Sequence, residues 1–384
     1  MSPERVLFVD HTGQIGGAEL ILLDVVEGRS RSSAFLFEDG PLGPALAERK
    51  LNIIVSNWGR NLSNFRRDSS WFAAVPLVAR LVAIVAEIAR AARSHDIVYA
   101  NSQKAFVLAA IASVFARRPL IWHLHDIISP DHFGAMQRRM QVLLANRRAA
   151  KVIVPSQAAA TAFIEAGGRS DLIEIVPNGL ALPPEARTPA ELRRSLELPT
   201  RPLVGVFSRL ARWKGQHVLL EALATMPDVG CIIVGDALFG EQAYAAELKQ
   251  MVLARGLADR VHFLGHRNDV PKLMMAVDAM VHPSIDPEPF GRTLVEAMLA
   301  GVPVIATNAG AAPDILEGGK AGTLVPPNDA PALARAIADV LAKPAALKDQ
   351  LDYALARAQA QYGVAQMLDK IDHVIRGTRT GAAA

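Results

Sequence analysis

The chain has 384 residues, of which 51% are hydrophobic and 21% charged, so it can bury a large core and is not a disordered or low-complexity protein. A single cysteine, Cys231, excludes an internal disulfide framework and a zinc site built from several cysteines. The net charge of +3 is too small to indicate a nucleic-acid-binding protein. At about 150 residues per domain, the length predicts two or three domains.

The first half of the chain alternates short apolar runs with longer helical ones. The helical runs include residues 18–26, 71–92 and 104–115. Between them the pattern predicts strands at residues 6–9, 51–55, 96–100, 120–124 and 151–155. This alternation is typical of a parallel sheet that has helices on both faces.

A cluster of prolines between residues 177 and 190 predicts a linker, followed by a short helix over residues 189–196 with Thr188 as its N-cap. The alternation then restarts, with strands predicted at 203–207, 231–234, 261–264, 279–282 and 302–306. The expected organisation is a first domain, a linker, a second domain and a C-terminal helix with a tail, over residues 1–178, 179–200, 201–362 and 363–384. We expect the tail to fray from Gly377, and whether the last helix returns to the first domain is left open.

The strongest motif is the segment 284–296, which follows a predicted strand and opens a helix. Ligands of open α/β sheets bind at the carboxyl ends of strands, and a helix N-terminus favours a phosphate or the hydroxyls of a sugar. Glu288 and Glu296 flank the turn at Gly291, where their carboxylates can accept hydrogen bonds from sugar or ribose hydroxyls. The alternative is one capping carboxylate and one ordinary helix glutamate.

Basic and glycine residues follow other strands of the second domain. Arg209 and Lys214 lie in a predicted strand-to-helix turn, where a guanidinium and an ammonium suit a diphosphate. The alternative is a surface turn that is merely basic. Gly235, His266 and Arg267 also come after predicted strands, and we expect them to form a weaker, nucleobase-binding region.

The first domain offers two further candidates. Gly16 and Gly17 follow its first strand, and residues without a side chain let the backbone approach a ligand closely. The segment lacks the GxGxxG pattern of dinucleotide-binding proteins, which argues against an oxidoreductase. His123 and His125 share one face of another strand end, where a functional role competes with a purely structural one. No third ligand at a convincing spacing supports a metal site there.

Taken together, these motifs resemble those of the retaining GT-B glycosyltransferases of family GT4, and the resemblance spans nearly the whole chain. The residues that carry it are Gly16-Gly17-Ala18-Glu19, His125-Asp126, Val176-Pro177-Asn178-Gly179, Ser208-Arg209-Leu210, Lys214-Gly215, the segment from Glu288 to Ala306, and Gly322-Thr323-Leu324-Val325-Pro326-Pro327. The chain departs from the family at Gly235-Asp236-Ala237, where many members have a Gly-x-Gly-Pro-like turn, and at Gly310-Ala311, where many have Gly-Gly.

The resemblance implies an α/β protein of the GT-B class, with two doubly wound, Rossmann-like domains that face each other across a cleft. It implies transfer of a hexose-type sugar from a nucleotide diphosphate sugar, with retention and without a metal or cofactor. It makes His125 and Glu288 the residues nearest the reacting sugar. The donor would be bound by Gly16, Gly17, Arg209, Lys214, Phe290, Gly291 and Glu296. A GT-B-fold nucleotide-sugar epimerase is the alternative, and a non-catalytic sugar-binding relic is a third hypothesis.

The acceptor is expected to be a glycan, a lipid-linked sugar or a small molecule. Residues 1–178 carry 20 Lys and Arg against 16 Asp and Glu, an excess of +4, whereas the remainder has 21 against 22, or −1. With the apolar run 71–92, this charge predicts a cytoplasmic protein that contacts an anionic membrane surface peripherally. The alternative is a packed helix with solvated arginines. The basic pairs are Arg66-Arg67, Arg117-Arg118, Arg138-Arg139 and Arg147-Arg148.

Overall fold

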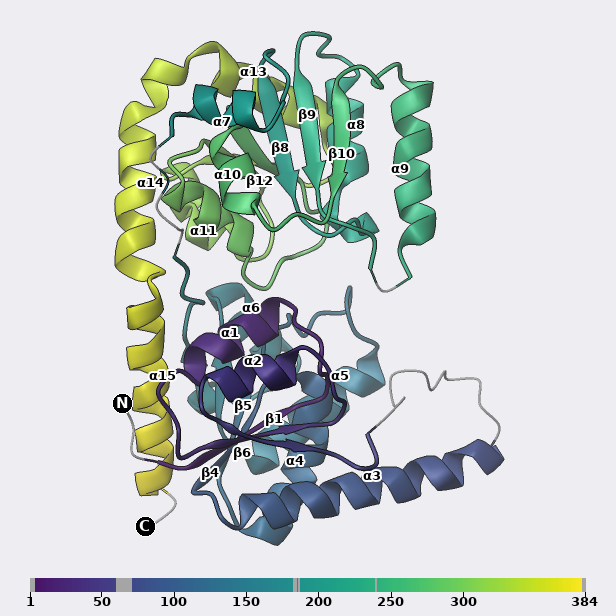
Figure 1. The fold of residues 1–384 in the computed structure, drawn as a ribbon, viewed down its shortest axis with the longest axis vertical. Helices are drawn as coiled ribbons and strands as arrows, with labels where there is room; N and C mark the ends of the chain where they lie inside the picture. Colours follow the sequence, from purple (N-terminus) through teal and green to yellow (C-terminus); the bar gives the residue numbers. More distant parts are fainter. Residues whose placement is uncertain (1–3, 60–70, 182–184, 186, 239, 382–384) are drawn as a thin grey trace. The chain divides into compact units, whose positions relative to one another are not determined.

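The computed structural model describes residues 4–59, 71–181, 185, 187–238 and 240–381. The chain divides into two compact units (Figure 1). The first unit combines the chain up to Gly179 with the part from Val364 onward, and the second is Leu180–Gly363. Each unit is a parallel sheet with helices on both faces, as the alternation in the sequence predicts.

The described part of the first unit contains a seven-stranded parallel sheet in the order β3-β2-β1-β4-β5-β6-β7. Its strands are β1 (Val6–Asp10), β2 (Ser33–Leu36), β3 (Asn52–Val55), β4 (Ile97–Ala100), β5 (Leu120–His123), β6 (Ala149–Val154) and β7 (Ile173–Ile175). The sequence analysis did not predict β2 and β7. Both are short, and the three residues of β7 alternate Ile-Glu-Ile with partial exposure, so neither gives a long apolar run.

Alternating side chains of β1 show how this sheet is covered on both faces. Leu7 and Val9 belong to one core with α3 (Trp71–Ala92), α4 (Gln103–Ala116), α5 (Ala135–Arg148) and α6 (Gln157–Glu165). Val6 and Phe8 belong to the other core with α1 (Gly17–Val25), α2 (Leu42–Glu48) and α15 (Val364–Gly381). A strand that is buried on both faces reads as an uninterrupted apolar run, which is why β1 was predictable.

The last helix, α15, is part of the first unit's core. Ile371 is fully buried there, and Asp372 forms a buried ion pair with Arg29. The expectation of a frayed tail from Gly377 is wrong, because the helix continues to Gly381. Arg379 reaches Glu4 at 3.4 Å, so a contact with the first residues of the described chain holds the last turns of the helix in place.

The second unit has a six-stranded parallel sheet among its described residues, in the order β10-β9-β8-β11-β12-β13. Its strands are β8 (Leu203–Phe207), β9 (Gly230–Val234), β10 (Val261–Gly265), β11 (Ala279–His282), β12 (Val304–Thr307) and β13 (Thr323–Val325). Its helices are α7 (Pro189–Ser195), α8 (Gln216–Leu223), α9 (Gln242–Ala254), α10 (Val270–Met275), α11 (Arg292–Leu299), α12 (Ala312–Ile315), α13 (Ala330–Ala342) and α14 (Lys348–Gln361).

The segment expected to be a linker, residues 179–200, contributes to the second unit from Leu180 onward. The predicted N-cap is confirmed, because the Thr188 side chain accepts the backbone N–H of Glu191 at 3.3 Å. Leu192 of α7 is buried, and the helix packs against α10. The proline-rich stretch therefore ends in a helix that is anchored to the sheet's covering layer.

In each sheet, the chain first adds strands on one side of the first strand and later adds strands on its other side. The position between the first strand and its neighbour on that other side is the switch point. Ligands of doubly wound sheets bind there, at the carboxyl ends of the strands. In the first sheet the switch point lies between β1 and β4, and in the second between β8 and β11. The side chains that follow these four strands are therefore the first place to look for a site in each unit.

Candidate active site

The switch point of the second sheet holds a buried ion pair. The Nζ atom of Lys214, in a short 3₁₀ turn after β8, contacts Oε2 of Glu288, in the loop after β11. The two side chains are only 10% and 14% exposed. Gly215 makes this approach feasible, because at its φ of +70° a Cβ would overlap the carbonyl oxygen of Pro283. The turn after β8 is thus pressed against the loop after β11.

Two further side chains complete the surroundings of Glu288. Its Oε2 atom lies 3.2 Å from Nε2 of His282 and 3.4 Å from Oγ of Ser284. Burial on its own raises the pKa of Glu288, but Lys214 and His282 outweigh that effect and hold the pKa well below its ordinary value. Burial lowers the pKa of Lys214, and Glu288 opposes that shift. The turn after β8 and the loop after β11 therefore bring an ammonium and a carboxylate into one buried ion pair.

The backbone of Glu288 is fixed by the loop after β12. Ala311 donates its N–H to the Glu288 carbonyl at 3.0 Å, and Gly310 has a φ of +59°. A Cβ on Gly310 would overlap the backbone nitrogen of Glu288. Gly310, which the sequence analysis noted only as a departure from the family pattern, therefore allows the two loops to meet.

The other residues of the 284–296 motif lie around the start of α11. Gly291 is its N-cap, with a φ of +79°, and the buried ring of Phe290 packs against that of Tyr362 at 5.9 Å between centroids. Glu296 lies inside the helix and pairs with Arg292 at 3.3 Å. The carboxylates of Glu288 and Glu296 thus have different partners, Lys214 for the first and Arg292 for the second.

The residues predicted to bind the nucleobase lie at the ends of β9 and β10. Gly235 donates its N–H to the carbonyl of Gly265 at 2.8 Å, which joins the two strand ends. His266 and Arg267 are exposed in the next turn, and Arg267 makes a two-pronged pair with Asp269 at 2.8 and 2.7 Å. Arg209 is exposed near Lys214, whose pKa it helps to lower.

In the first unit, the predicted glycines lie at the start of α1. Gly16 is the N-cap and donates its N–H to Oε2 of Glu19 at 2.8 Å. A Cβ on Gly17 would meet nothing within 4 Å, whereas one on Gly13 would collide with the backbone of Asp39. Packing therefore requires glycine at position 13 but not at position 17, which leaves close approach of a ligand as a reason for Gly17.

His125 lies two residues beyond β5 in a network of buried polar groups. Its Nε2 atom is 3.0 Å from Oδ1 of Asn101, and Asn101 in turn donates to Asp10. Burial lowers the pKa of His125 to about 4, although Asp10 opposes this shift. The ring of His125 also lies 3.9 Å from that of His123, whose Nδ1 is 2.6 Å from the Tyr99 hydroxyl. His125 is therefore an uncharged imidazole at neutral pH.

Sequence reasoning missed three polar residues of these two clusters, Asp10, Asn101 and His282, and gave no role to Ser284, the first residue of the segment 284–296. A signal for them existed, because each of them ends a strand or follows one within two residues. The rule that selected His125 and Glu288, applied to every strand end, would have found them.

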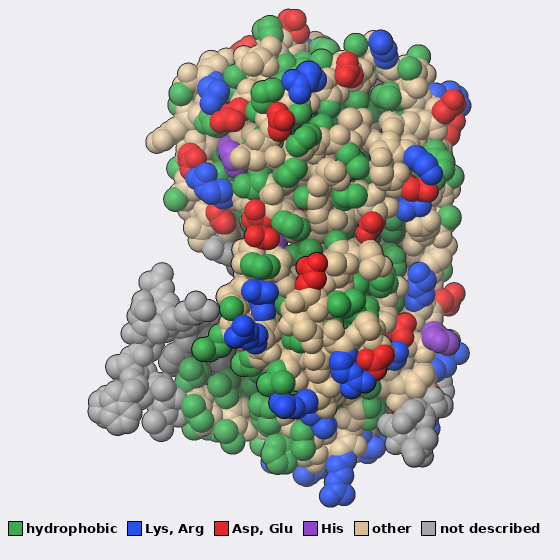
Figure 2. Space-filling view, turned by 180° about the vertical axis from the view of Figure 1, so that it is seen from behind, with side chains coloured by type: hydrophobic (Ala, Val, Ile, Leu, Met, Phe, Trp, Pro, Cys, Tyr) green, Lys and Arg blue, Asp and Glu red, His purple; other side chains and the backbone are tan. Residues whose placement is uncertain are grey.

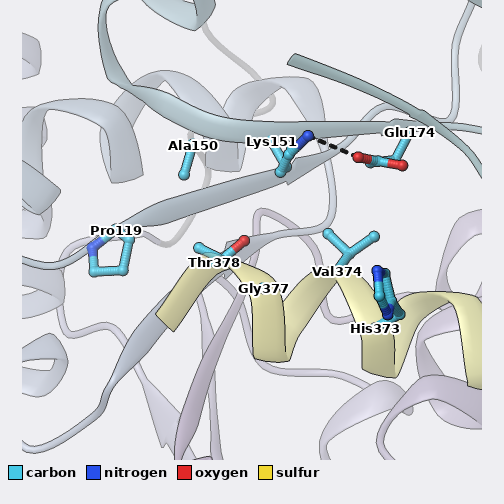
Figure 3. A pocket seen from close by; sticks show the side chains of 8 residues that line it. All are labelled: Pro119, Ala150, Lys151, Glu174, His373, Val374, Gly377 and Thr378. Atoms are coloured by element: carbon cyan, nitrogen blue, oxygen red, sulfur yellow. Dashed lines mark hydrogen bonds and ion pairs between the residues drawn. The ribbon is translucent and has the colours of Figure 1, made fainter. Parts of the chain in front are cut away.

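A separate cavity of about 430 Å³ lies at the opposite, amino-terminal edge of the first sheet (Figure 3). It is lined by the starts of β5 and β6, by β7 and by the last turns of α15. Lys151 and Glu174 form an ion pair at 2.7 Å in its wall. Because its two charged groups of opposite sign already satisfy each other, we do not assign it to an anionic donor.

No group of three or more His, Cys, Asp or Glu side chains in the described part of the chain is placed to hold a metal ion. Likewise, no helix among the described residues is both long enough and apolar enough to cross a membrane.

Two doubly wound units with charged side chains at their switch points are typical of α/β enzymes that bind a nucleotide or another phosphorylated ligand. Comparison of the sequence with known protein families identifies which of these enzymes the chain resembles. The family described as "Glycosyl transferase 4-like domain" matches residues 17–179, and "Glycosyl transferases group 1" matches residues 189–357. The crystal structure of Anabaena Alr3699/HepE in complex with UDP-glucose is 41% identical and has a TM-score of 0.87, covering 97% of this chain and 100% of that one. The chain therefore belongs to the group 1 glycosyltransferases of family GT4, and its fold is GT-B.

More distant relatives agree with this assignment. The mannosyltransferase LpsB of lipopolysaccharide core biosynthesis from Rhizobium meliloti is 32% identical over 220 residues, which are 53% of this chain and 62% of LpsB. LpcC of Rhizobium leguminosarum is 34% identical over 171 residues, 44% of this chain and 48% of LpcC. The match thus spans about half to three-fifths of these curated relatives. Sucrose-phosphate synthase of Thermosynechococcus elongatus, 21% identical with a TM-score of 0.80, shares the fold.

Proposed function

We propose that the protein is a retaining glycosyltransferase that moves a hexose-type sugar from a nucleotide diphosphate sugar to a glycan, a lipid-linked sugar or a small molecule. The observation that carries this proposal is the Lys214–Glu288 pair at the switch point of the second sheet. An ammonium suits a diphosphate and a carboxylate suits sugar hydroxyls, and both lie beside the N-terminus of α11. The similar Alr3699/HepE crystal structure is a complex with UDP-glucose, which supports a donor of this chemical class.

In the second unit, donor binding exchanges the partners of the ion pair. The diphosphate takes over Lys214 together with the nearby Arg209, and Glu288 then accepts a hydrogen bond from a hydroxyl of the transferred sugar. Glu296 binds the ribose, and the backbone N–H groups of Phe290 and Gly291 help to fix the sugar and phosphates. The protein's contribution is to position the donor and to stabilise charge on the leaving diphosphate.

The remaining predicted roles follow the family. We assign Gly235, after β9, and His266 and Arg267, after β10, to the nucleobase. In the first unit we assign Gly16 and Gly17 to the diphosphate, and His125 to the reacting sugar. We infer that the reaction needs neither a metal nor a cofactor.

The epimerase alternative is not favoured by the relatives, which are transferases. A direct measurement separates the two functions. An epimerase isomerises the nucleotide sugar without an acceptor, whereas a transferase incubated with the donor alone leaves the sugar's configuration unchanged.

The test of the proposed function has two stages. A thermal-shift panel of UDP, GDP, ADP and their hexose derivatives identifies the donor by the stabilisation it confers. Product formation is then measured with glycan, lipid-linked and small-molecule acceptors, and NMR of the product reports whether the anomeric configuration is retained. An inverted product would contradict the retaining mechanism, and the absence of any nucleotide-dependent stabilisation would contradict the donor site.

Two variants on one turn give a matched comparison for the donor site. Lys214→Ala should weaken donor binding about 10- to 100-fold, because charged hydrogen bonds to phosphate contribute about 1.5–3 kcal/mol each. Arg212→Ala removes a cation two residues away that pairs with Glu247 at the surface, and it should leave donor binding close to wild type. Equal loss in both variants would mean that the turn, not the Lys214 ammonium, matters.

The acceptor side of the proposal includes peripheral contact with an anionic membrane, and helix α5 supports it best. Met136 is 85% exposed, and Met140 and Leu143 are exposed on the same stripe of the helix. Arg139 and Arg147 are exposed on that side too, and no Asp or Glu lies within Ala135–Arg148. An apolar stripe between arginines fits the interface of an anionic bilayer. Figure 2 shows hydrophobic and basic side chains side by side over the first unit.

The apolar run that first suggested a membrane divides between core and surface over residues 77–92, where its side chains are described. Within α3, Ile84 and Ile88 are fully buried, and Val78 and Val82 are exposed. The basic pair Arg66-Arg67 lies outside the described residues.

Sedimentation with vesicles tests the membrane contact. We expect binding to vesicles that contain an anionic lipid, loss of binding at high salt, and loss in the triple variant Met136→Ser, Met140→Ser, Leu143→Ser. Leu253→Ser is the control, because Leu253 of α9 in the second unit is 71% exposed and equally apolar. Absence of binding at low salt would contradict the contact and favour a water-soluble acceptor.

A further inference from the structure

We propose that Asn101, held in one orientation by Asp10, is a positioning residue that keeps the proton of His125 on Nε2 and leaves Nδ1 as the hydrogen-bond acceptor of the ring. The tautomer follows from contacts within the first unit alone. Its consequence for sugar transfer rests on the proposed function.

Neighbouring strands bring the three residues together. β1, β4 and β5 are adjacent in the sheet, and Val9 of β1 is paired with Ala100 of β4. Asp10 is the next residue of β1, Asn101 is the next residue after β4, and both are fully buried. The side chains therefore meet at the carboxyl edge of the switch point, where a ligand is expected in a doubly wound sheet.

The carboxylate of Asp10 decides which way the amide of Asn101 points. Oδ1 of Asp10 accepts a hydrogen bond from the backbone N–H of His11 at 2.6 Å. The backbone nitrogen of Thr12 lies 3.4 Å from the same oxygen. Oδ2 accepts from Nδ2 of Asn101 at 2.7 Å. A carboxylate only accepts hydrogen bonds, so the NH₂ group of the amide must face Asp10. The reverse orientation would place two acceptor oxygens against each other between two buried side chains.

The orientation of the amide then decides the tautomer of His125. With its NH₂ group on Asp10, Asn101 presents Oδ1 to His125, and this oxygen is 3.0 Å from Nε2. An oxygen can only accept, so Nε2 carries the hydrogen. Burial lowers the pKa of His125 to about 4, so near neutral pH the ring has a single proton. Nδ1 is then unprotonated.

The neighbouring groups of the ring do not disturb this assignment. His123, whose ring lies 3.9 Å away, is itself held neutral because burial lowers its pKa. Its Nδ1 is engaged by the hydroxyl of Tyr99 at 2.6 Å, and burial raises the pKa of Tyr99, so that group stays uncharged. His125 can therefore accept a hydrogen bond from a sugar hydroxyl through Nδ1 but cannot donate one there.

Long-range ¹⁵N–¹H correlation spectra of the whole protein, labelled on histidine, read the tautomer directly. The chain has ten histidines, so His125→Gln assigns the signal. At pH 7 we expect His125 to show a protonated Nε2 and an unprotonated Nδ1. The opposite pattern in the wild-type protein would overturn the proposal, whether or not the protein transfers sugar.

The variant Asp10→Asn tests directly whether Asp10 sets the orientation of Asn101. In this variant the side-chain oxygen still accepts from His11, so the new NH₂ group faces Asn101 and turns its amide around. Asn101 then presents NH₂ to His125, and we expect the proton to move to Nδ1. An unchanged tautomer would overturn the proposal. If Asp10→Asn does not fold, Asn101→Ala replaces it, and we expect this variant to show a mixture of both tautomers of His125. A single Nε2-protonated form in Asn101→Ala would contradict the proposal.

The assay of transfer separates positioning from a general loss of structure. A reversed tautomer removes one acceptor for a sugar hydroxyl, so kcat of Asp10→Asn should fall about 10- to 100-fold, a loss comparable to one hydrogen bond. The control Asn146→Ala removes a half-buried asparagine that is hydrogen-bonded to the backbone of Gly167 and Arg169 in the same unit, and it should change neither the tautomer nor kcat. A reversed tautomer with unchanged kcat would contradict the assigned role of His125 and leave the positioning by Asn101 intact.

Discussion

Replacing Lys214 by methionine should destabilise the second unit, because it leaves the carboxylate of Glu288 buried without its cation. Removing one partner of a buried ion pair costs about 3–5 kcal/mol. His282 and Ser284 remain as neighbours of the carboxylate at 3.2 and 3.4 Å, so we expect the lower end of that range, about 3 kcal/mol. Glu288→Gln has a similar effect, because it leaves the Lys214 ammonium buried.

The double variant should lose less stability than the two single variants added together, because it buries no charge. We expect a coupling free energy of about 2 kcal/mol between the two positions. For a domain of this size, 1 kcal/mol corresponds to about 2–4 °C in Tm, so each single variant should unfold about 6–12 °C earlier than wild type.

Urea unfolding of the full chain measures the free energy of unfolding of each variant. Hydrogen exchange of peptides from Leu180–Gly363 then shows whether the loss of stability lies in the second unit. Lys348 and Asp352 form an exposed pair on α14, with side chains 77% and 65% exposed, and serve as the control. Their coupling should stay below about 0.5 kcal/mol. Additive losses at Lys214 and Glu288 would refute the reasoning, since they would mean that the two charges stabilise the fold independently.

Three further outcomes are expected. Gly310→Ala should lower the Tm and donor affinity together, because its Cβ would overlap the backbone of Glu288, and a wild-type melting curve would contradict this. The pKa of His125 is about 4 in the folded state, below the value near 6.5 that a histidine has in an unfolded chain. Between pH 6.5 and 4 the unfolded state therefore binds more protons than the folded state. The folded state loses stability as the pH falls through this range. His125→Gln should flatten this part of the pH dependence, measured by urea unfolding at several pH values, and an unchanged dependence would contradict the assignment. Transferase activity should survive EDTA, and restoration by Mg²⁺ or Mn²⁺ after chelation would contradict the metal-independent mechanism.

Much of the fold was predictable because both sheets are buried on two faces. Strands such as β8 and β11 read as uninterrupted apolar runs, and their bounds in the structure match the predicted ones. The strand β2 was missed because it has only four residues, and β7 and β13 because three residues each carry too little signal. Helix propensity alone could not predict that α15 continues to Gly381. The last turns are held by contacts with the distant first residues of the chain, such as Arg379 with Glu4.

The candidate site was predictable residue by residue but not as a set of contacts. Lys214 and Glu288 were each selected for their position after a strand, yet their pairing depends on β8 and β11 being neighbours in the sheet. The same holds for Asp10 and Asn101, which the order of β1 and β4 brings together. Strand order is a property of the whole domain, so local patterns of a single sequence do not reveal it.

The return of the last helix to the first unit has a consequence for how the chain folds during synthesis. The second unit is continuous, Leu180–Gly363, and all of its core residues are available once that segment has left the ribosome. The first unit begins earlier but lacks Met367, Ile371 and the partner of Arg29 until α15 has been made. The N-terminal unit should therefore be the last to reach its native core, which reverses the usual order for a multidomain chain. A released chain that ends at Gly363 would have a folded second unit, whereas its first unit would still be open to proteolysis.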